Sequence, residues 1–163
     1  MFIGVVSDTH NNLKNIEQII SLFNNEEIKL VIHTGDIANA KSLAKFSNLN
    51  ADLIGVYGNN DRNELGLQDV AIKYSFQFQE PPKLLTLCNR NIAVFHEPDS
   101  IDNFLMLNKK IDIVLHGHTH RYRNEIEEDI LFFNPGESAG MQAGMNAIGL
   151  VNLENLETKR IFF

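Results

Sequence analysis

The sequence has a single cysteine, no tryptophan and no long hydrophobic run. Because Cys88 has no second cysteine to pair with, an intramolecular disulfide is excluded, which is typical of a reducing compartment. Its neighbours, residues 85–87, predict a strand in which Cys88 acts as a small hydrophobic residue rather than a nucleophile. No apolar run approaches the ~18 residues of a membrane span, and no basic region with a cleavage site marks a secretion signal. These absences predict a cytoplasmic protein without a membrane partner.

Positive charge is also scarce, because 14 Lys and Arg residues stand against 21 Asp and Glu residues, which gives a formal net charge of −7. Nonspecific binding to nucleic acid depends on Lys and Arg that neutralise phosphates, so we expect no nucleic-acid partner. The same charge would repel a phosphate substrate unless bound cations reverse the sign locally. The charge balance therefore indicates a metal if the substrate is a phosphate.

What is present is an ordinary globular composition, with 44% hydrophobic and 21% charged residues. A chain of 163 residues buries about two-thirds of its unfolded surface when it folds. We find no repeat, low-complexity segment or linker. The sequence therefore predicts a single domain that spans residues 1–163.

The first half of the chain alternates strand and helix patterns, which favours parallel strands joined by crossovers. The predicted strands are residues 2–6, 30–32 and 52–57, and the predicted helices are residues 12–24, 40–49 and 64–72. The second half contains a helix over residues 101–107, strands over residues 76–79 and 111–115, and antiparallel pairs over residues 84–88 with 92–95, 122–126 with 130–133, and 147–153 with 158–163. We expect the pair at 122–133 to be exposed. The pattern predicts two mixed sheets with helices outside.

Five of the predicted strands end in side chains that commonly bind metal ions. These side chains are Asp8 with His10, Asp36, Asn59, His96, and His118 with His120. In open α/β sheets, ligands bind at the carboxyl ends of the strands. A single Asp there more often caps a helix, but the repetition favours a metal site. In the two pairs, we expect residues two apart to point to one side of an extended segment.

The two remaining histidines are expected to be structural. His33 should hydrogen-bond to the backbone beside Asp36, and His116 should support a metal ligand from outside the coordination sphere.

The order of these motifs resembles that of the calcineurin-like metallophosphoesterases, in particular the small single-domain phosphodiesterase branch and its relative, the retromer subunit with a phosphoesterase fold. The matching motifs are Asp8-Thr-His10, Gly35-Asp36, Gly58-Asn59, His96, Gly117-His118-Thr-His120 and Asn134-Pro135-Gly136. They cover nearly the whole chain. The resemblance implies an α/β fold, a four-layer α-β-β-α sandwich of two mixed sheets with helices on the outside.

The resemblance also implies two divalent metal ions. One would be held by Asp8, His10 and His120, the other by Asn59, His96 and His118, and Asp36 would bridge them. The catalytic positions it implies are Asp36, Asn59, Asn60 and His96. Such ions lie ~3.5–4 Å apart and generate a hydroxide near neutral pH. The mixed imidazole and carboxylate ligands favour Mn²⁺, with Fe, Zn²⁺, Ni²⁺, Co²⁺ and Mg²⁺ as alternatives.

Three positions depart from the family pattern. Asn60 stands where the family usually has His or Cys. Because an amide cannot act as a general acid, the leaving group would take its proton from water or need none. Glu97 and Asp99 follow His96 where Gly is common, and they either flank the site and disfavour dianionic monoesters or belong to a solvated loop. Glu137 replaces a usually small residue, and the sequence suggests no role for it.

The leading hypothesis is a dinuclear-metal-dependent phosphoesterase, in particular a phosphodiesterase that hydrolyses a small soluble phosphate ester with metal-bound hydroxide. The alternative is a non-catalytic protein-interaction scaffold that retains a metal site. We also expect a homodimer, because Phe162 and Phe163 end a predicted edge strand and would leave apolar surface exposed.

Overall fold

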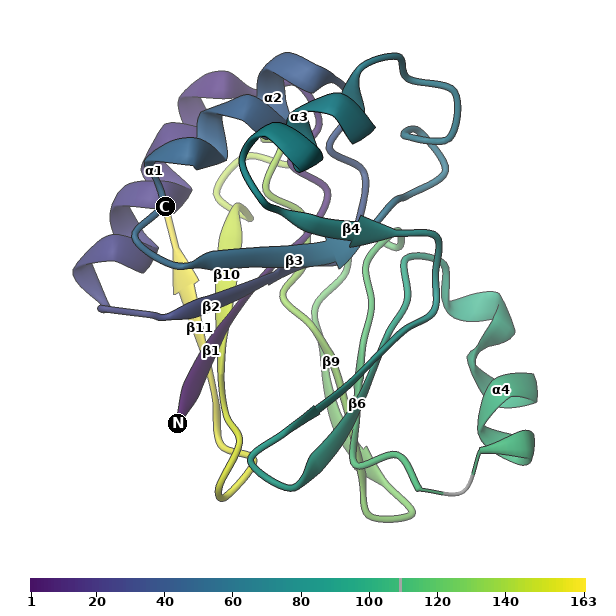
Figure 1. The fold of residues 1–163 in the computed structure, drawn as a ribbon. Coiled ribbons are helices and arrows are strands. Elements are labelled where there is room, and N and C mark those ends of the chain that lie inside the picture. Colours follow the sequence, from purple (N-terminus) through teal and green to yellow (C-terminus); the bar gives the residue numbers. More distant parts are fainter. Residues whose placement is uncertain (109) are drawn as a thin grey trace.

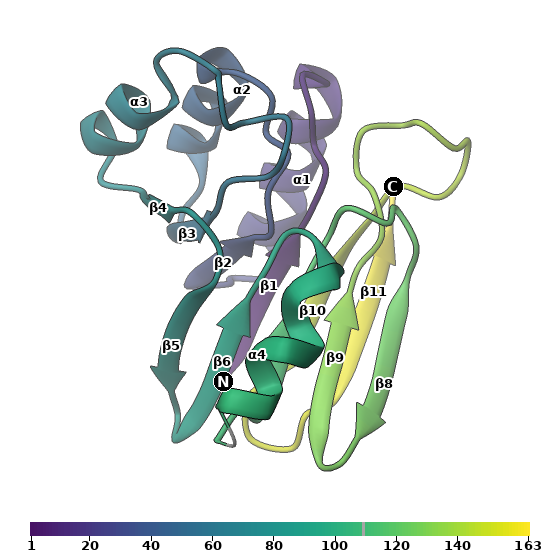
Figure 2. The same cartoon turned by 90° about the vertical axis from the view of Figure 1, so that its right-hand side faces the viewer.

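Two β-sheets packed face to face form the centre of the molecule, with helices on both outer faces (Figures 1 and 2). The computed structural model describes residues 1–108 and 110–163. The first sheet contains β1 (Phe2–Val6), β2 (Leu30–His33), β3 (Asp52–Val56), β4 (Gln77–Gln79), β10 (Ala147–Asn152) and β11 (Thr158–Phe162). The second sheet contains β5 (Lys83–Leu87), β6 (Arg90–Val94), β7 (Ile113–Leu115), β8 (Arg123–Glu127) and β9 (Ile130–Asn134).

Both sheets are mixed. The strand order is β11-β10-β1-β2-β3-β4 in the first sheet and β5-β6-β7-β9-β8 in the second. Strands β1 to β4 are parallel, whereas β10 and β11 join as antiparallel neighbours. Strands β6, β7 and β9 are parallel, and the antiparallel strands β5 and β8 form the edges. The carboxyl ends of β1, β2 and β3 therefore meet at one edge of the first sheet.

The helices cover the outer faces of the sandwich. They are α1 (Leu13–Asn25), α2 (Ala40–Lys45), α3 (Leu67–Lys73) and α4 (Ile101–Leu107), with the 3₁₀ turns η1 (Phe46–Asn48) and η2 (Pro98–Ser100). As Figure 2 shows, α1, α2 and α3 lie beside the first sheet and α4 lies on the second. The side-chain amide oxygen of Asn12 accepts a hydrogen bond from the Asn15 N–H and caps α1.

Three separate apolar cores hold these layers together. The first, around Phe23 and Phe46, packs α1 to α3 against the first sheet. The second, which includes Ile3 and Phe133, fills the space between the two sheets. The third, around Phe95, packs α4 against the second sheet. Three cores between four layers confirm the predicted α-β-β-α sandwich.

Three local predictions were wrong. The helix predicted over 40–49 ends at Lys45 and tightens into η1. Strand β9 is buried rather than exposed, because it lies between β7 and β8, and only β8 faces solvent. Cys88 is exposed in a turn and not in a strand. Leu87 pairs with Arg90, so Cys88 and Asn89 form a two-residue turn with φ values of 49° and 60°.

Among the described residues, the helices are all too short or too polar to cross a membrane.

Candidate metal centre

All seven predicted metal ligands converge at one end of the sandwich, where strands of both sheets stop. The ligand atoms of Asp8, His10 and His120 lie within 4.8 Å of one another, and so do those of Asp8, Asp36 and His96. Asn59 joins the cluster because its Oδ1 lies 3.0 Å from His96 Nε2 and 3.0 Å from His118 Nδ1. The structure thus brings the predicted set together, while the coordination role of each atom stays a prediction.

The cluster has a buried floor and an open rim. Asp8, Asp36 and His96 are buried, whereas Asn59 and His118 are exposed. A small molecule in solvent can therefore approach the cluster from the side of Asn59 and His118.

His96 is oriented by the backbone of the strand-end loop. Its Nδ1 lies 2.8 Å from the carbonyl oxygen of Thr34, so the proton of a neutral ring sits on Nδ1 and donates to that oxygen. The lone pair on Nε2 then faces Asn59 Oδ1 at 3.0 Å and Asp36 Oδ1 at 3.4 Å. Three acceptors that face one another favour a cation between them.

One of the two carboxylate oxygens of Asp8 also lacks a hydrogen-bond donor. Its Oδ2 accepts hydrogen bonds from the Ser7 hydroxyl and from the His118 N–H. Its Oδ1 is buried without a hydrogen-bond partner, because the nearby His120 Nε2, at 3.3 Å, lacks hydrogen-bond geometry. The Nε2 atom of His10 is likewise buried and unpartnered.

Divalent cations fit this donor set. Burying a carboxylate is costly unless a positive charge balances it. Across residues 1–108 and 110–163, Asp8 and Asp36 form ion-pair contacts with histidines and with no Lys or Arg. Carboxylate, imidazole and amide groups are the ligand types that first-row divalent metals accept. The unpartnered atoms Asp8 Oδ1 and His10 Nε2 are where such ions would bind.

The charges in the cluster depend on one another. Burial alone would raise the pKa of Asp36, but the His96 ring and the two N–H groups of Asn60 outweigh it and hold that pKa well below its usual range. Burial lowers the pKa of His96, but the Asp36 carboxylate outweighs this effect and raises it. The Asp8 carboxylate raises the pKa of His120. The Asp36 carboxylate thus stays ionised and attracts positive charge.

The backbone at the ligands differs from the extended segments that we expected for the two pairs. Asp8, His10, Asp36, His118 and His120 have φ values of 51°, 45°, 59°, 66° and 56°. These values lie in the left-handed region, which costs about 1–3 kcal/mol at a non-glycine residue and is common at functional sites. Each pair converges because the chain turns there, and not because side chains alternate along a strand.

Glycines permit the close packing around Asp36. Gly35 has a φ of 106°, and a Cβ there would lie 2.6 Å from His96 Nδ1. A Cβ on Gly58 would collide with Asp36 Oδ1. Both glycines are therefore required where the sequence places them.

His33 supports this loop as predicted. Its Nδ1 accepts a hydrogen bond from the Gly35 N–H at 3.1 Å, so its Nε2 carries the proton and donates to Thr9 Oγ1 at 3.0 Å. Burial lowers the pKa of His33 to about 3, so the ring is neutral at physiological pH.

His116 is also buried, and burial lowers its pKa. Its Nδ1 lies 3.2 Å from the carbonyl oxygen of Gly117.

The structure shows the contacts of the residues at the three positions that depart from the family pattern. Asn60 Nδ2 donates to Asp36 Oδ2 at 2.6 Å, so this side chain faces the cluster. Glu97 forms an ion pair with Arg62 at 2.5 Å, which offsets its charge, and Asp99 is exposed in η2. Glu137 is buried, and its carboxylate accepts hydrogen bonds from the N–H groups of Gly140 and Gln142, which orders the loop after β9.

Sequence reasoning missed Asp61, a buried residue next to the cluster. Both of its carboxylate oxygens accept backbone hydrogen bonds. An Asp three residues after Gly58 could be expected to bind the N–H of that turn, but nothing in the sequence indicates that its other three donors come from a second loop.

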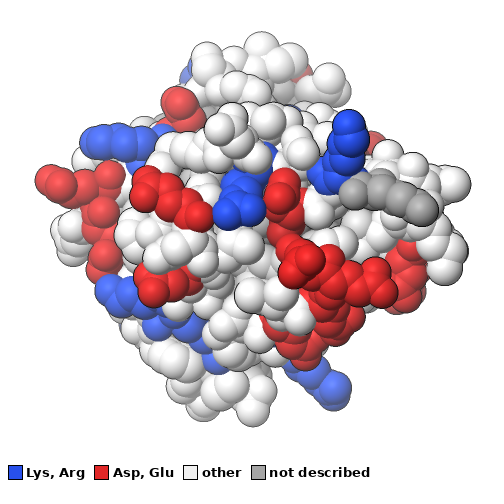
Figure 3. Space-filling model, turned by 90° about the horizontal axis from the view of Figure 1, so that it is seen from below, with Lys and Arg blue, Asp and Glu red and all other residues white. Residues whose placement is uncertain are grey.

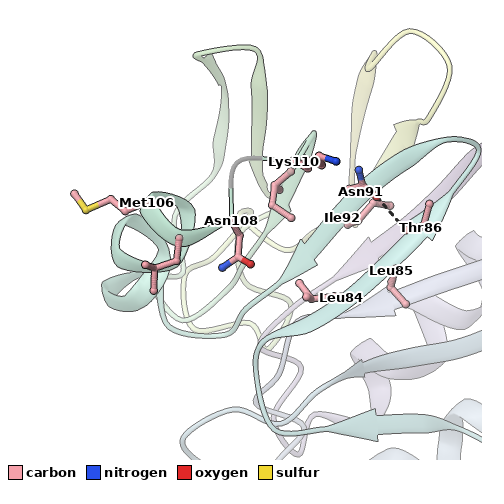
Figure 4. Close-up of a pocket in the computed structure, with 10 residues that line it drawn as sticks. Leu84, Leu85, Thr86, Asn91, Ile92, Met106, Asn108 and Lys110 are labelled. Carbon is pink, nitrogen blue, oxygen red and sulfur yellow. Dashed lines mark hydrogen bonds between the residues drawn. The ribbon is translucent and has the colours of Figure 1, made fainter.

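Other hollows of the described surface lie away from the cluster. A cavity of about 620 Å³ lies between α4 and the β5–β6 hairpin, beside Leu84, Leu85 and Met106 (Figure 4). A hollow of about 940 Å³ is bordered by Asp102, Asp112 and the β8–β9 turn. Figure 3 shows Asp and Glu side chains gathered at the end of the sandwich that carries this turn, opposite the carboxyl ends of β1 and β6. Much of the negative charge therefore lies far from the cluster.

The chain is similar to known proteins over nearly its whole length. A phosphodiesterase of Methanocaldococcus jannaschii is 32% identical to this chain over 163 residues, which cover 99% of this chain and 98% of the relative. The solved structure of an archaeal phosphodiesterase matches with a TM-score of 0.90 and 31% identity, over 100% of both chains. Vps29 of Entamoeba histolytica, solved in complex with Zn²⁺, shares the fold with a TM-score of 0.69 at 15% identity over 99% of both chains. The domain model of the calcineurin-like phosphoesterase superfamily matches residues 1–156, and the chain therefore belongs to this family of hydrolases, as its motifs predict.

Proposed function

We propose that this protein is a phosphodiesterase that hydrolyses a small phosphate ester at a centre of two divalent cations, with Mn²⁺ as the preferred ion. Asp8, His10 and His120 would hold one cation, Asn59, His96 and His118 would hold the other, and Asp36 would be shared by both. The relative from M. jannaschii carries the name phosphodiesterase, which supports the substrate class.

The observation that carries the proposal is the set of buried acceptors without donors. Asp8 Oδ1 and His10 Nε2 have no hydrogen-bond partner, and His96 Nε2 faces two oxygens. Such atoms are costly to bury in a protein that gains nothing from them. When two cations are bound, they activate water as the nucleophile and stabilise charge on the phosphoryl oxygens.

The protein's own residues prepare the site for this chemistry. The Thr34 carbonyl fixes the His96 ring, and His33 stays neutral and holds the loop before Asp36. The open rim at Asn59 and His118 admits the ester. The Thr34 carbonyl and His33 thus orient ligands and do not exchange protons with the substrate.

Proton supply to the leaving group is the weak step. Asn60 is directed at the cluster, but its amide donates hydrogen bonds without releasing a proton. Esters whose leaving group is stable as an anion should therefore react fastest. We infer a preference for aryl esters because of their leaving group, and for diesters because of their charge, over ordinary alkyl monoesters.

Substrate charge supports the same preference. A diester carries one negative charge, whereas a monoester is largely a dianion at neutral pH. Arg62 offsets the charge of Glu97 through an ion pair. Of the two carboxylates in residues 97–99, Asp99 is the one for which the described structure shows no such pair. The charge effect should therefore be smaller than the leaving-group effect.

The test compares bis(p-nitrophenyl) phosphate, p-nitrophenyl phosphate and glucose 6-phosphate on protein treated with a chelator and then supplied with MnCl₂. We expect no turnover without metal, restored turnover with Mn²⁺, and the highest rate on the aryl diester. The variant Asp8→Asn should lose activity by more than about 100-fold, beyond the effect typical of supporting residues. The matched control is Asp52→Asn, an exposed carboxylate at the opposite end of β3.

Two results would overturn the proposal. Full activity after removal of metal would exclude the cation mechanism. Stoichiometric metal binding without turnover on any of the three esters would favour the scaffold alternative.

A further inference from the structure

Asp61 accepts four backbone hydrogen bonds with one buried carboxylate. Its Oδ2 accepts from the N–H groups of Asp36 at 2.9 Å and Gly58 at 2.8 Å. Its Oδ1 accepts from the N–H groups of Ile37 at 2.9 Å and Ala38 at 2.8 Å. The residue is 4% exposed, so water cannot replace these bonds easily.

Only an ionised carboxylate satisfies this arrangement. It offers two oxygens with two lone pairs each, which match four donors. An Asn at this position would offer one oxygen, and its NH₂ group would face N–H groups that have no acceptor. The arrangement is therefore specific to the acid and not to a side chain of this shape.

The four donors belong to two different loops, and each loop carries a predicted ligand. Asp36, Ile37 and Ala38 lie in the loop after β2, and Gly58 directly precedes Asn59 in the loop after β3. The contact is reciprocal, because the Asn60 N–H donates to Asp36 Oδ1 at 3.0 Å. Asp61 and Asp36 therefore lock the two loops together.

Backbone hydrogen bonds also connect the loop after β2 to the loop after β1. The His10 N–H donates to the Asp36 carbonyl at 2.9 Å, and the Asp8 N–H donates to the Gly35 carbonyl at 3.0 Å. Asp36 and Ala38 also have left-handed φ values of 59° and 76°, which need support from their surroundings. A loss of the Asp61 bonds would thus reach ligands of both proposed cations.

We propose that Asp61 is a positioning residue that sets the affinity of the centre for both cations without touching either. This inference rests on the proposed function, since it assumes that the cluster binds metal. Groups that orient metal ligands from outside typically change metal affinity by 10–100-fold when they are replaced. Asp61 holds the backbone of a ligand that both cations would share.

The experiment measures Mn²⁺ binding to the metal-free protein by isothermal titration calorimetry at 25 °C. The variants are Asp61→Asn and the control Asp112→Asn. Asp112 is also a carboxylate that accepts a backbone N–H, from Asn91 at 2.8 Å, but it lies at the far end of the second sheet. We expect two Mn²⁺ sites in the unaltered protein, affinities at least tenfold weaker in Asp61→Asn, and unchanged affinities in Asp112→Asn. Thermal unfolding without metal reports how far each variant is destabilised.

The outcomes separate the two proposals. Absence of Mn²⁺ binding in the unaltered protein would overturn the proposed function. Normal binding there, together with equal affinities in both folded variants, would overturn the role of Asp61 and leave the function standing.

If Asp61→Asn does not fold, Asp61→Glu decides the question, because it keeps the carboxylate but displaces it by one methylene. A loss of affinity of at least threefold in folded Asp61→Glu supports the inference, and a smaller change overturns it.

Discussion

The Asn60 side chain donates a hydrogen bond to Asp36 Oδ2 over 2.6 Å, and the backbone N–H of the same residue donates to Asp36 Oδ1 over 3.0 Å. Position 60 therefore faces the carboxylate that both cations would share. In the proposed centre, a side chain at this position would lie close to the phosphate of a bound substrate.

Replacing Asn60 by His should raise activity toward esters with poor leaving groups. A histidine could donate a proton to a departing alkoxide, which typically contributes ~10²–10⁴-fold. An aryl oxide leaves without a proton, so rates on bis(p-nitrophenyl) phosphate should barely change. Steady-state rates on that ester and on a cyclic nucleotide, whose leaving group is an alkoxide, provide the measurement.

An equal gain on both esters would mean that position 60 acts through metal or substrate binding. The control is Asn60→Gln, which is polar but cannot supply a proton. Asp61 is not available to orient the new imidazole, because both of its oxygens already accept backbone N–H groups.

Replacing Asp36 by Asn should reduce Mn²⁺ affinity and turnover more than replacing a histidine outside the cluster does. The amide removes the negative charge that two cations would share, so Mn²⁺ affinity and turnover should both fall by more than about 100-fold. His116→Ala should lower Mn²⁺ affinity by a smaller factor, at most the ~10–100-fold that is typical of supporting residues. Calorimetric titration and initial rates on the aryl diester give the comparison, and equal losses in the two variants would mean that the histidines are misassigned.

Acid should destabilise the protein partly through His33. The folded pKa is about 3 and the unfolded value is about 6.5, so the unfolded state binds the extra proton between these values. The stability that neutral His33 contributes is complete above pH 6.5 and is lost as the pH falls toward 3. The free energy of unfolding should fall by up to about 1.4 kcal/mol per pH unit from this group.

The measurement is urea unfolding of the metal-free protein at pH 7.5, 6 and 5. His33→Gln is the matched variant, because it removes the titrating ring and leaves the other acids and histidines in place. Its unfolding free energy should depend less steeply on pH than that of the unaltered protein. Parallel pH profiles would show that His33 does not remain neutral in the folded state.

An exposed phenylalanine on the edge strand of the first sheet predicts a homodimer. Phe162 lies on the edge strand β11 and is 55% exposed, with the Arg160 guanidinium over its ring at 4.4 Å. Sedimentation at micromolar concentration should give twice the chain mass of 18.5 kDa, and Phe162→Lys should give the single mass. A single-mass species in the unaltered protein would contradict the prediction.

The positions of most strands and of the cluster could be read from the sequence because both depend on local patterns. Short apolar runs that end in Gly, Asp or Asn, such as residues 30–36, predict buried strands and the edge where they stop. Parallel strands must bring these ends together, so Asp36 and Asn59 could be expected side by side.

What the sequence did not reveal depends on register and on backbone turns. Cys88 looks like part of an apolar strand, but the pairing of Leu87 with Arg90 makes it a turn residue. The left-handed φ values of Asp8 and His118 are maintained by contacts from distant segments, such as the hydrogen bond between the His118 N–H and Asp8 Oδ2. Likewise, the role of Asp61 appears only when two loops are placed against each other.

The proposed ligands come from both halves of the sandwich. Asp8, Asp36 and Asn59 follow strands of the first sheet, whereas His96, His118 and His120 follow strands of the second. A bound cation would therefore crosslink the two sheets. The sheets could separate only if the cation dissociated. Metal saturation would stabilise the closed sandwich by mass action, by ~2.7 kcal/mol at a hundredfold excess over the dissociation constant. The slowest amide exchange in the metal-loaded protein should then lie in β1, β2, β6 and β7, whose ends the metal joins.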